Sequence, residues 1–264
     1  MIDLHNHLLP GLDDGARTLE ESMEMCRISV HDGVRTIVAT PHSLNGVYEN
    51  DRPTILAKVR ELNAEISNKS WGPNPAPGIL PGSGDQADLK ILPGADIHFS
   101  LEILAQLDQK KAMTIGDGGK FLLLEFPSQG IPYGAEGVLF QLLARGVTPI
   151  LTHPERNLEI ARRPHRYGEM IRRGCLGQVS AMSLTGGFGR TVRKVAETLL
   201  EKRLVHFIAS DAHSPNGRPP VISSAVQAAA KIVGAEEARR MVTEYPQDIL
   251  AGRRPNFPGP NGRL

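Results

Sequence analysis

Histidine and aspartate side chains near the start of the chain have spacings that suit metal binding. His5 and His7 are separated by one residue, so on a β-strand both imidazoles leave the same face and can hold one metal ion. Asp13 and Asp14 follow in a short loop bounded by glycines, and His42 ends the next apolar run. Together these side chains can supply nitrogen and oxygen ligands to one centre.

Further candidate ligands occur at the ends of later apolar runs. They are Asp96, Glu125, His153, Asp211 and His213. A single histidine at such a place is more often a hydrogen-bonded structural residue, but a carboxylate such as Glu125 rarely ends a buried run without a partner. The set of five histidines and four acids therefore predicts a metal site, and its nitrogen and oxygen ligands suit manganese, iron or zinc. The histidines that lie off this pattern are interpreted as structural; they are His31, His98, His165 and His206.

Short apolar runs alternate with amphipathic stretches over most of the chain, which is typical of repeated βα units and a parallel sheet. Strands are predicted near residues 2–5, 35–40, 91–97, 121–126, 148–152, 176–181 and 205–210. Helices are predicted near residues 18–32, 53–68, 101–109, 134–145, 165–173, 189–203, 220–233 and 235–243. Thr18 followed by Glu21 fits a capping box at the start of the first helix.

Six of the seven predicted strands have a candidate ligand at the carboxyl end, which carries the active site in a parallel α/β barrel. Such barrels commonly reach about 250 residues as one domain. We therefore expect residues 1–250 to form a single domain with the metal site at the carboxyl ends of its strands. Clusters of proline and glycine predict a long loop at 72–84, either contacting substrate or merely tolerated, and a flexible tail at 251–264.

Composition and charge exclude several classes of function. The 30 Lys and Arg residues nearly balance the 29 Asp and Glu residues, and the formal charge of +1 disfavours a nucleic-acid-binding protein. No apolar run approaches the roughly 18 residues that span a bilayer, and the first residues lack the pattern of a secretory signal. We therefore expect a cytoplasmic protein without membrane insertion. Cys26 and Cys175 lie far apart in the sequence and form neither a metal-binding pair nor a disulfide framework.

Several of these segments, taken in order, resemble the motifs of the polymerase-and-histidinol-phosphatase (PHP) superfamily. The segments are Asp3-Leu4-His5-Asn6-His7, Asp13-Asp14-Gly15, Thr40-Pro41-His42, Leu124-Glu125-Phe126, His153-Pro154-Glu155-Arg156 and Ser210-Asp211-Ala212-His213. The second and fifth of them, with Gly217-Arg218-Pro219-Pro220, resemble more narrowly the bacterial manganese-dependent protein-tyrosine phosphatases encoded with capsule and exopolysaccharide genes. The resemblance extends from residue 1 to about residue 250.

The resemblance implies a distorted (β/α)7 TIM-like barrel, the PHP fold, that holds three metal ions. The ligands of the first ion would be His5, His7, Asp211 and Asp96. The ligands of the second would be Asp96, Glu125 and His153, and those of the third Asp14, His42 and His213. The family usually has glutamate in place of Asp96, whose side chain is one methylene shorter, so either the backbone lies closer to the ions or the bridge between the first two ions is weaker. We expect two to three ions, Mn2+ in preference to iron or zinc.

The charge of a phosphate ester suggests a mechanism. A multinuclear metal site can hold the oxygens of a phosphate monoester and supply a metal-bound hydroxide as the nucleophile. Both cysteines lie outside any C-x5-R loop, which disfavours a thiol nucleophile. Arg156 and Arg218 follow ligand motifs, so each is either a phosphate-binding guanidinium or a solvated surface residue. Asp13 or a metal-bound water could protonate the leaving phenolate.

The function that the resemblance favours is metal-dependent hydrolysis of phosphotyrosine, with a bacterial tyrosine kinase of the polysaccharide-export system as substrate. One alternative is a small-molecule phosphomonoesterase such as histidinol-phosphate phosphatase. The aromatic content of 5 % offers few residues for a deep small-molecule pocket. A second alternative, from another class, is a non-catalytic binding or regulatory module in which metal ions only stabilise the fold. The nearly complete set of ligands disfavours it, because such a module would be expected to lose some of them.

Overall fold

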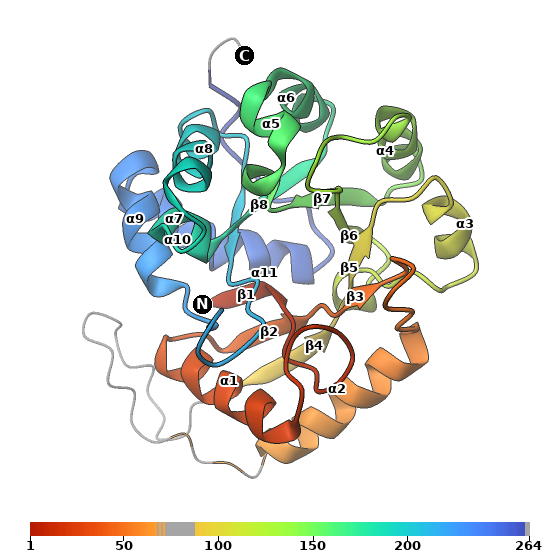
Figure 1. Cartoon of the computed structure of the whole chain (residues 1–264), viewed down its shortest axis with the longest axis vertical. Helices are drawn as coiled ribbons and strands as arrows, with labels where there is room; N and C mark the ends of the chain where they lie inside the picture. The colour runs from red at the N-terminus through yellow and green to blue at the C-terminus, as the bar shows by residue number, and fades with distance from the viewer. Residues whose placement is uncertain (68, 70, 72–87, 262–264) are drawn as a thin grey trace.

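The computed structural model describes residues 1–67, 69, 71 and 88–261, so the loop predicted at 72–84 lies outside the described residues. Figure 1 shows the strands in the middle of the molecule and most of the helices around them. The strands are β1 (Ile2–Asn6), β2 (Thr36–Ala39), β3 (His42–Ser43), β4 (Lys90–Pro93), β5 (Asp96–His98), β6 (Phe121–Glu125), β7 (Thr148–Thr152), β8 (Leu176–Ser180) and β9 (Phe207–Ala209). The α-helices are α1 (Leu19–His31), α2 (Arg52–Ser67), α3 (Ile103–Asp108), α4 (Ala135–Ala144), α5 (Leu158–Arg162), α6 (His165–Arg172), α7 (Ala181–Thr185), α8 (Arg190–Glu201), α9 (Ser223–Val233), α10 (Ala235–Arg240) and α11 (Glu244–Leu250). Two 3-10 helices complete the description, η1 (Ile115–Asp117) and η2 (Pro154–Arg156).

The named strands pair in parallel throughout. One sheet has the order β1-β2-β4, and the second has the order β3-β5-β6-β7-β8-β9. A parallel bridge between Asn6 and Ala212 joins the end of β1 to the segment that follows β9. The prediction of an α/β protein built on parallel strands is confirmed.

One of the seven predicted strands is followed by a short strand beyond its predicted range, and another is divided in two. The strand predicted at 35–40 becomes β2, and β3 follows it after Pro41. The strand predicted at 91–97 becomes β4 and β5, separated by Gly94 and Ala95. Proline has no backbone N–H to donate to a strand ladder, so the first strand is interrupted at Pro41.

Gly94 lets the second bend pack closely against β2. A Cβ atom on Gly94 would lie 2.7 Å from Val38 Cγ1 and 3.2 Å from Thr40 Cγ2, closer than side-chain carbons normally approach. Beyond the two bends, β3 and β5 pair so that His42 lies opposite Asp96. The bends thus bring two of the predicted ligands together.

All eight predicted helices are present with shifted ends, and α5, α7 and α11 are additional. The additional helices have five to seven residues, too few for a 3.6-residue periodicity to be recognised. Thr18 caps α1 as predicted, because its hydroxyl accepts a hydrogen bond from the Glu21 backbone N–H (3.3 Å). The Glu21 carboxylate accepts hydrogen bonds from Arg17 and not from the backbone of Thr18.

Polar residues are buried within the strands beside the apolar core. β1, β8 and β9 are buried along their whole length, and the first two contain Asp3, His5 and Gln178. Buried polar groups require hydrogen-bond partners, and buried charges require a counter-charge or a metal ion. The buried polar side chains in these strands are therefore typical of a binding or catalytic site.

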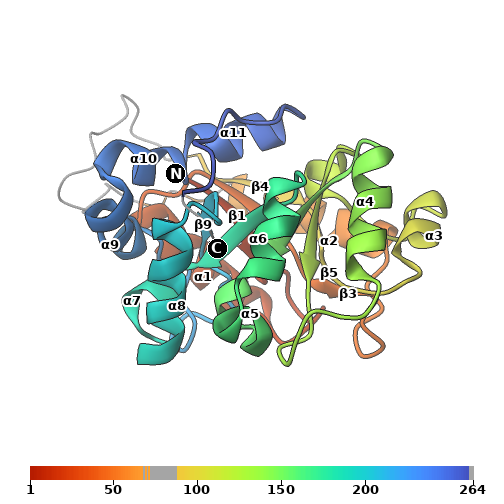
Figure 2. The same cartoon turned by 90° about the horizontal axis from the view of Figure 1, so that it is seen from above.

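The C-terminal part of the described chain packs against the start of the sheets. The Ile2 backbone N–H donates a hydrogen bond to the Val242 carbonyl (2.8 Å), and α11 lies above the strands in the view of Figure 2. Within the tail that was predicted to be flexible, the Phe257 ring contacts His206 and Tyr245 at centroid distances of 4.4 and 4.7 Å. None of the described helices is long and apolar enough to cross a membrane.

Candidate metal centre

The structure brings all nine predicted ligand residues into one cluster. Each of them has an imidazole nitrogen or a carboxylate oxygen within 3.7 Å of such an atom of another member. They lie on or after β1, β3, β5, β6, β7 and β9, toward the carboxyl ends of the strands. The nine residues are His5, His7, Asp14, His42, Asp96, Glu125, His153, Asp211 and His213.

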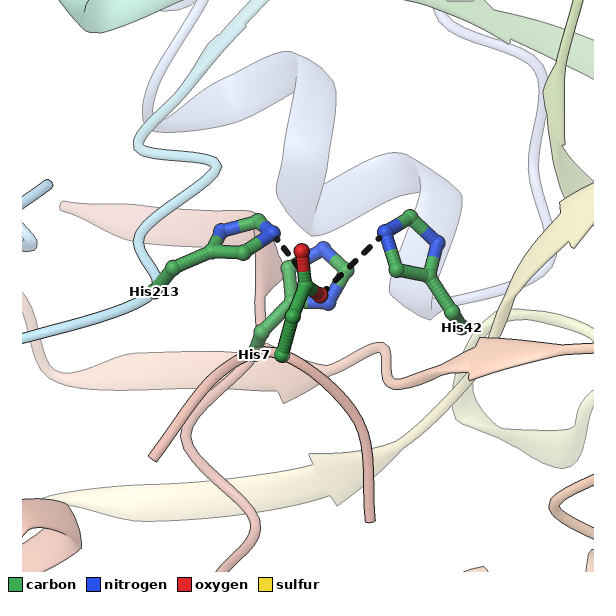
Figure 3. A group of neighbouring side chains, drawn as sticks. His7, His42 and His213 are labelled. Atoms are coloured by element: carbon green, nitrogen blue, oxygen red, sulfur yellow. Dashed lines mark ion pairs between the residues drawn. The ribbon is translucent and has the colours of Figure 1, made fainter. Parts of the chain in front are cut away.

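His7, Asp14, His42 and His213 form one group of potential ligands. Asp14 Oδ1 lies 3.5 Å from His213 Nε2 and 3.6 Å from His42 Nε2. Figure 3 shows the three labelled imidazoles turned toward one another, with dashed lines for these two ion pairs. The resemblance placed Asp14, His42 and His213 at one ion, and the structure adds His7 to this group.

Two further groups share Asp96. His5, His7 and Asp96 form one of them, and His42, Asp96 and Glu125 form the other. Asp96 Oδ2 lies 3.6 Å from both His5 Nε2 and His42 Nδ1. Asp96 therefore lies between the two groups, at the place of the bridging carboxylate in the resemblance.

His153 and Asp211 lie beside these groups. His153 Nε2 is 3.3 Å from Glu125 Oε1. Asp211 Oδ1 is 3.6 Å from His5 Nε2 and 3.7 Å from His7 Nε2. His153 therefore lies beside Glu125, and Asp211 lies beside the His5 and His7 pair.

The hydrogen bonds of the histidines show that the cluster fits a metal ion. His5 Nδ1 lies 2.8 Å from Gln178 Oε1, and His7 Nδ1 lies 2.7 Å from Asp13 Oδ2. If each Nδ1 donates its proton to that oxygen, both Nε2 atoms carry lone pairs, and these two atoms are only 2.9 Å apart. Two lone pairs that face each other at this distance repel, and a cation bound by both nitrogen atoms would remove that repulsion. Asp96 Oδ2 is also buried without a hydrogen-bond partner among the described residues.

Burial sets the protonation states that a metal site requires. It lowers the pKa values of His5, His7 and His153 and so favours the neutral imidazole, which is the ligand form. Burial, reinforced by the nearby Glu125 and Asp211 carboxylates, raises the pKa of Asp96 well above its usual range. A bound cation would reverse this effect and hold Asp96 as a carboxylate.

Arg156 and Arg218 converge beside the ligands. Arg156 Nη2 lies 3.0 Å and Arg218 Nη2 lies 2.7 Å from the same Asp211 Oδ2. Both side chains are about a quarter exposed, at 23 % and 25 %, and both line a cavity of about 330 Å³ together with His42 and Glu125. The cavity thus joins two fixed guanidinium groups to the candidate metal ligands, an arrangement suited to a phosphate group.

Asp13 lies behind the cluster. Its side chain is fully buried, and Oδ2 accepts a hydrogen bond from the His42 backbone N–H (2.8 Å) in addition to its contact with His7 Nδ1. Oδ1 accepts a hydrogen bond from the Gly15 N–H (2.9 Å). These contacts suit a residue that orients two histidines better than one that delivers a proton to a leaving group.

Sequence reasoning missed several residues that contact the cluster, among them Gln178, His98, Ser180 and Thr152. Gln178 is a polar residue in the middle of a strand that is buried along its whole length, between Gly177 and the apolar Val179, and this is the signal that could have drawn attention to it. His98, interpreted as structural, lies with Nδ1 3.6 Å from Glu125 Oε2, and the two residues are register partners on β5 and β6. Its position two residues after Asp96, on the same face of the strand, could have predicted this neighbour.

The two cysteines are buried thiols outside the cavity lining. Burial raises the pKa of Cys26 and of Cys175 to about 12, so neither is a thiolate at neutral pH. This result agrees with the prediction that the chemistry needs no cysteine nucleophile.

The fold and this cluster define an α/β protein with a candidate histidine-carboxylate metal site beside a pair of arginines. Residues 1–78 and 81–251 match the family described as "Capsular polysaccharide synthesis, CpsB/CapC", and the chain belongs to this family. The family resemblance found in the motifs is therefore confirmed.

Named relatives agree with this assignment. Tyrosine-protein phosphatase YwqE of Bacillus subtilis is 34 % identical over 95 % of this chain and 91 % of its own length. Putative tyrosine-protein phosphatase CapC of Staphylococcus aureus is 35 % identical over 83 % of this chain and 79 % of its own length. Among solved structures, YwqE and CpsB of Streptococcus pneumoniae are described as unique metal-dependent tyrosine phosphatases. That match has a TM-score of 0.87, 33 % identity and full coverage of both chains.

Proposed function

We propose that this protein is a metal-dependent protein-tyrosine phosphatase. The observation that carries the proposal is the cluster of nine candidate ligands, six of which line the same cavity as Arg156 and Arg218. The relatives named as tyrosine-protein phosphatases support it. The physiological substrate that we propose is a bacterial tyrosine kinase that controls capsule or exopolysaccharide synthesis, and the enzyme would act on it in the cytoplasm.

The fold that we propose for this activity is a distorted seven-stranded (β/α)7 barrel. In this description β2 with β3, and β4 with β5, count as two bent strands. The bridge between Asn6 and Ala212 supports closure between β1 and the segment after β9. Residues 1–250 would form the barrel, followed by the short tail.

The cluster would hold two to three ions, Mn2+ in preference to iron or zinc. The proposed ligands are His5, His7, Asp14, His42, Asp96, Glu125, His153, Asp211 and His213. When bound, divalent cations in such a cluster polarise phosphoryl oxygens and activate water for attack. Asp96 has a shorter side chain than glutamate, but its Oδ2 faces both His5 and His42, which supports its role between two ions.

The protein's own side chains would bind the substrate and keep the site in its active form. Arg156 and Arg218 would bind the phosphate dianion through charge-assisted hydrogen bonds. Gln178 and Asp13 would hold His5 and His7 in the tautomer whose Nε2 faces the cluster. Phe126 and Ile160 line the same cavity and offer an apolar surface for the aryl group.

A comparison of two substrates tests this function. The manganese-loaded protein should have a higher kcat/KM on a phosphotyrosine peptide than on histidinol phosphate, and the reverse order would indicate a small-molecule phosphatase. A His42→Ala variant should lose activity by orders of magnitude, while the exposed His165→Ala serves as the matched control. If neither substrate is hydrolysed while the metal is bound, the protein is a non-catalytic binding module in which the metal only stabilises the fold, and the proposal is wrong.

A further inference from the structure

Both guanidinium groups beside the cluster lie against one aromatic ring. The Cζ atom of Arg156 is 5.1 Å from the centroid of the Phe188 ring, and that of Arg218 is 5.5 Å from it. Cations within about 6 Å of a ring centroid are attracted by the negative face of the ring. Phe188 is half-buried in the turn between α7 and α8.

The two guanidinium groups need such support because they repel each other. Their Nη2 atoms lie 3.0 and 2.7 Å from one carboxylate oxygen, Asp211 Oδ2. The Asp211 carboxylate carries one negative charge against the two positive charges of the guanidinium groups. Arg218 Nη2 also donates a hydrogen bond to the Asp211 carbonyl (2.9 Å), whereas Arg218 Nε is buried without a hydrogen-bond partner among the described residues, so only one end of the guanidinium group is held by hydrogen bonds.

The chain holds the Phe188 turn in a defined conformation. Gly186 and Gly189 both have φ of +90°, which glycine adopts without strain. The Gly187 N–H donates a hydrogen bond to the Met182 carbonyl (2.8 Å), and a Cβ atom on Gly187 would lie 2.5 Å from Met182 Cε. The glycines therefore fold the turn closely onto α7 and fix where the ring lies.

A buried carboxylate connects this turn to the segment that carries Arg156. Glu155 Oε1 accepts hydrogen bonds from the Ser180 backbone N–H (3.0 Å) and from Ser183 Oγ (2.6 Å). Ser180 is the N-cap residue of α7, and Ser183 lies within that helix. Arg156 directly follows Glu155, so its backbone is tied to the helix that leads into the Phe188 turn.

We propose that Phe188 is a positioning residue that stacks on Arg156 and Arg218 and holds both guanidinium groups in place to bind one phosphate group. This inference rests on the proposed function in that the phosphate is taken to be the reacting group of the substrate. Phe188 acts through the two arginines and does not need to touch the substrate. Its loss weakens phosphate binding because the guanidinium groups no longer stay together.

Binding of inorganic phosphate to the manganese-loaded protein, measured by calorimetry, tests the proposal. Phosphate has no aryl group, so contact between Phe188 and a tyrosine ring cannot contribute to the result. Phe188→Leu should raise the Kd for phosphate about tenfold, whereas Phe188→Tyr, which keeps the ring, should bind like the wild type. Phe140→Leu, a change in an exposed phenylalanine on α4, is the matched control.

Metal content is measured for every variant and should be unchanged, since Phe188 is not among the proposed ligands, and Tm is measured to show that each variant is folded. Phe188→Met provides a second ring-free variant if Phe188→Leu does not fold. With phosphotyrosine peptide as substrate, the ring-free variants should raise KM more than they lower kcat. A phosphate Kd of Phe188→Leu within twofold of the wild type would overturn the proposal, as would an equal loss in Phe188→Tyr. Either result concerns phosphate binding only, so it is distinguishable from a failure of the wild type to hydrolyse phosphotyrosine.

Discussion

The histidines of the cluster owe their ligand form to the residues behind them. Gln178 and Asp13 each accept a hydrogen bond from one Nδ1, and the Asp211 carbonyl lies 3.0 Å from His213 Nδ1. In each case the opposite nitrogen, Nε2, faces the other candidate ligands. Residues in such supporting positions commonly change metal affinity by about 10–100-fold when they are replaced.

Asp13→Asn tests whether Asp13 orients His7 or acts as a proton donor. We expect the variant to bind Mn2+ about 10–100-fold more weakly, because an amide stabilises the His7 N–H less than a carboxylate does. At saturating metal its activity should fall by the same factor on phenyl phosphate and on p-nitrophenyl phosphate. The exposed Asp108→Asn is the control, and a markedly larger loss on phenyl phosphate, whose leaving group needs the proton more, would assign the acid role to Asp13.

At the residue scale, residue type and spacing sufficed to predict which side chains the fold brings into one cluster. A histidine pair at strand spacing and single ligands at strand ends can be recognised within short segments, as His5 and His7 illustrate. The roles of Gln178 and His98 depend on which strand lies beside which, because their partners are 173 residues away and on the neighbouring strand. Such long-range register is not encoded in local spacing.

At the element scale, the bends between β2 and β3 and between β4 and β5 position the ligands. They place His42 and Asp96 directly opposite each other. The alternation of apolar and amphipathic segments predicted the order of the elements, but it could not place the bend at Gly94. The break at Gly94 depends on how closely its backbone approaches Val38 and Thr40, which only the packed structure reveals.

Gly94→Ala should disturb both stability and the metal site. An added Cβ would meet Val38 Cγ1 at 2.7 Å, so we expect a loss of about 1–3 kcal/mol in the free energy of unfolding and weaker Mn2+ binding. Urea denaturation and metal titration measure the two effects. Gly137→Ala on α4 is the matched control, because its Cβ would meet nothing within 4 Å and should stabilise the helix by up to about 1 kcal/mol. Equal stability of the two variants would contradict this account of the bend.

At the scale of the whole molecule, the tail and the sheets enclose a neutral histidine. His206 Nδ1 accepts a hydrogen bond from the Gly177 N–H (3.0 Å), and the Phe257 ring covers it. Burial, with a smaller effect of Arg254, lowers the pKa of His206 from 6.5 to about 3. Between these two values the unfolded chain binds a proton that the folded protein does not, so stability must fall as the pH falls below 6.5.

The contribution of His206 to stability can be measured by urea denaturation at two pH values. Between pH 7 and pH 5 the wild type should lose about 2 kcal/mol more than His206→Asn, whose side-chain oxygen can accept the Gly177 hydrogen bond without titrating. The exposed His165→Asn should keep the pH dependence of the wild type. The same pH dependence in His206→Asn and in the wild type would show that His206 is not held neutral by the fold.

The near-neutral charge of the whole chain does not describe the charge around the site, because the fold distributes the charged residues unevenly. Several of its acids and histidines are gathered in one place, where the carboxylates alone would repel a phosphate group. Attraction for an anionic substrate would then come from bound metal ions and the arginine pair, which a count of side-chain charges does not include.

The central claim is that the histidine-carboxylate cluster is a metal site required for phosphotyrosine hydrolysis. The most direct measurement is a titration of metal-depleted protein with Mn2+, following the initial rate on a phosphotyrosine peptide and the bound metal in the same samples. The account predicts negligible activity without metal and a rate that rises with occupancy until two to three ions are bound per chain. Full activity in the metal-depleted, chelator-treated protein would contradict it.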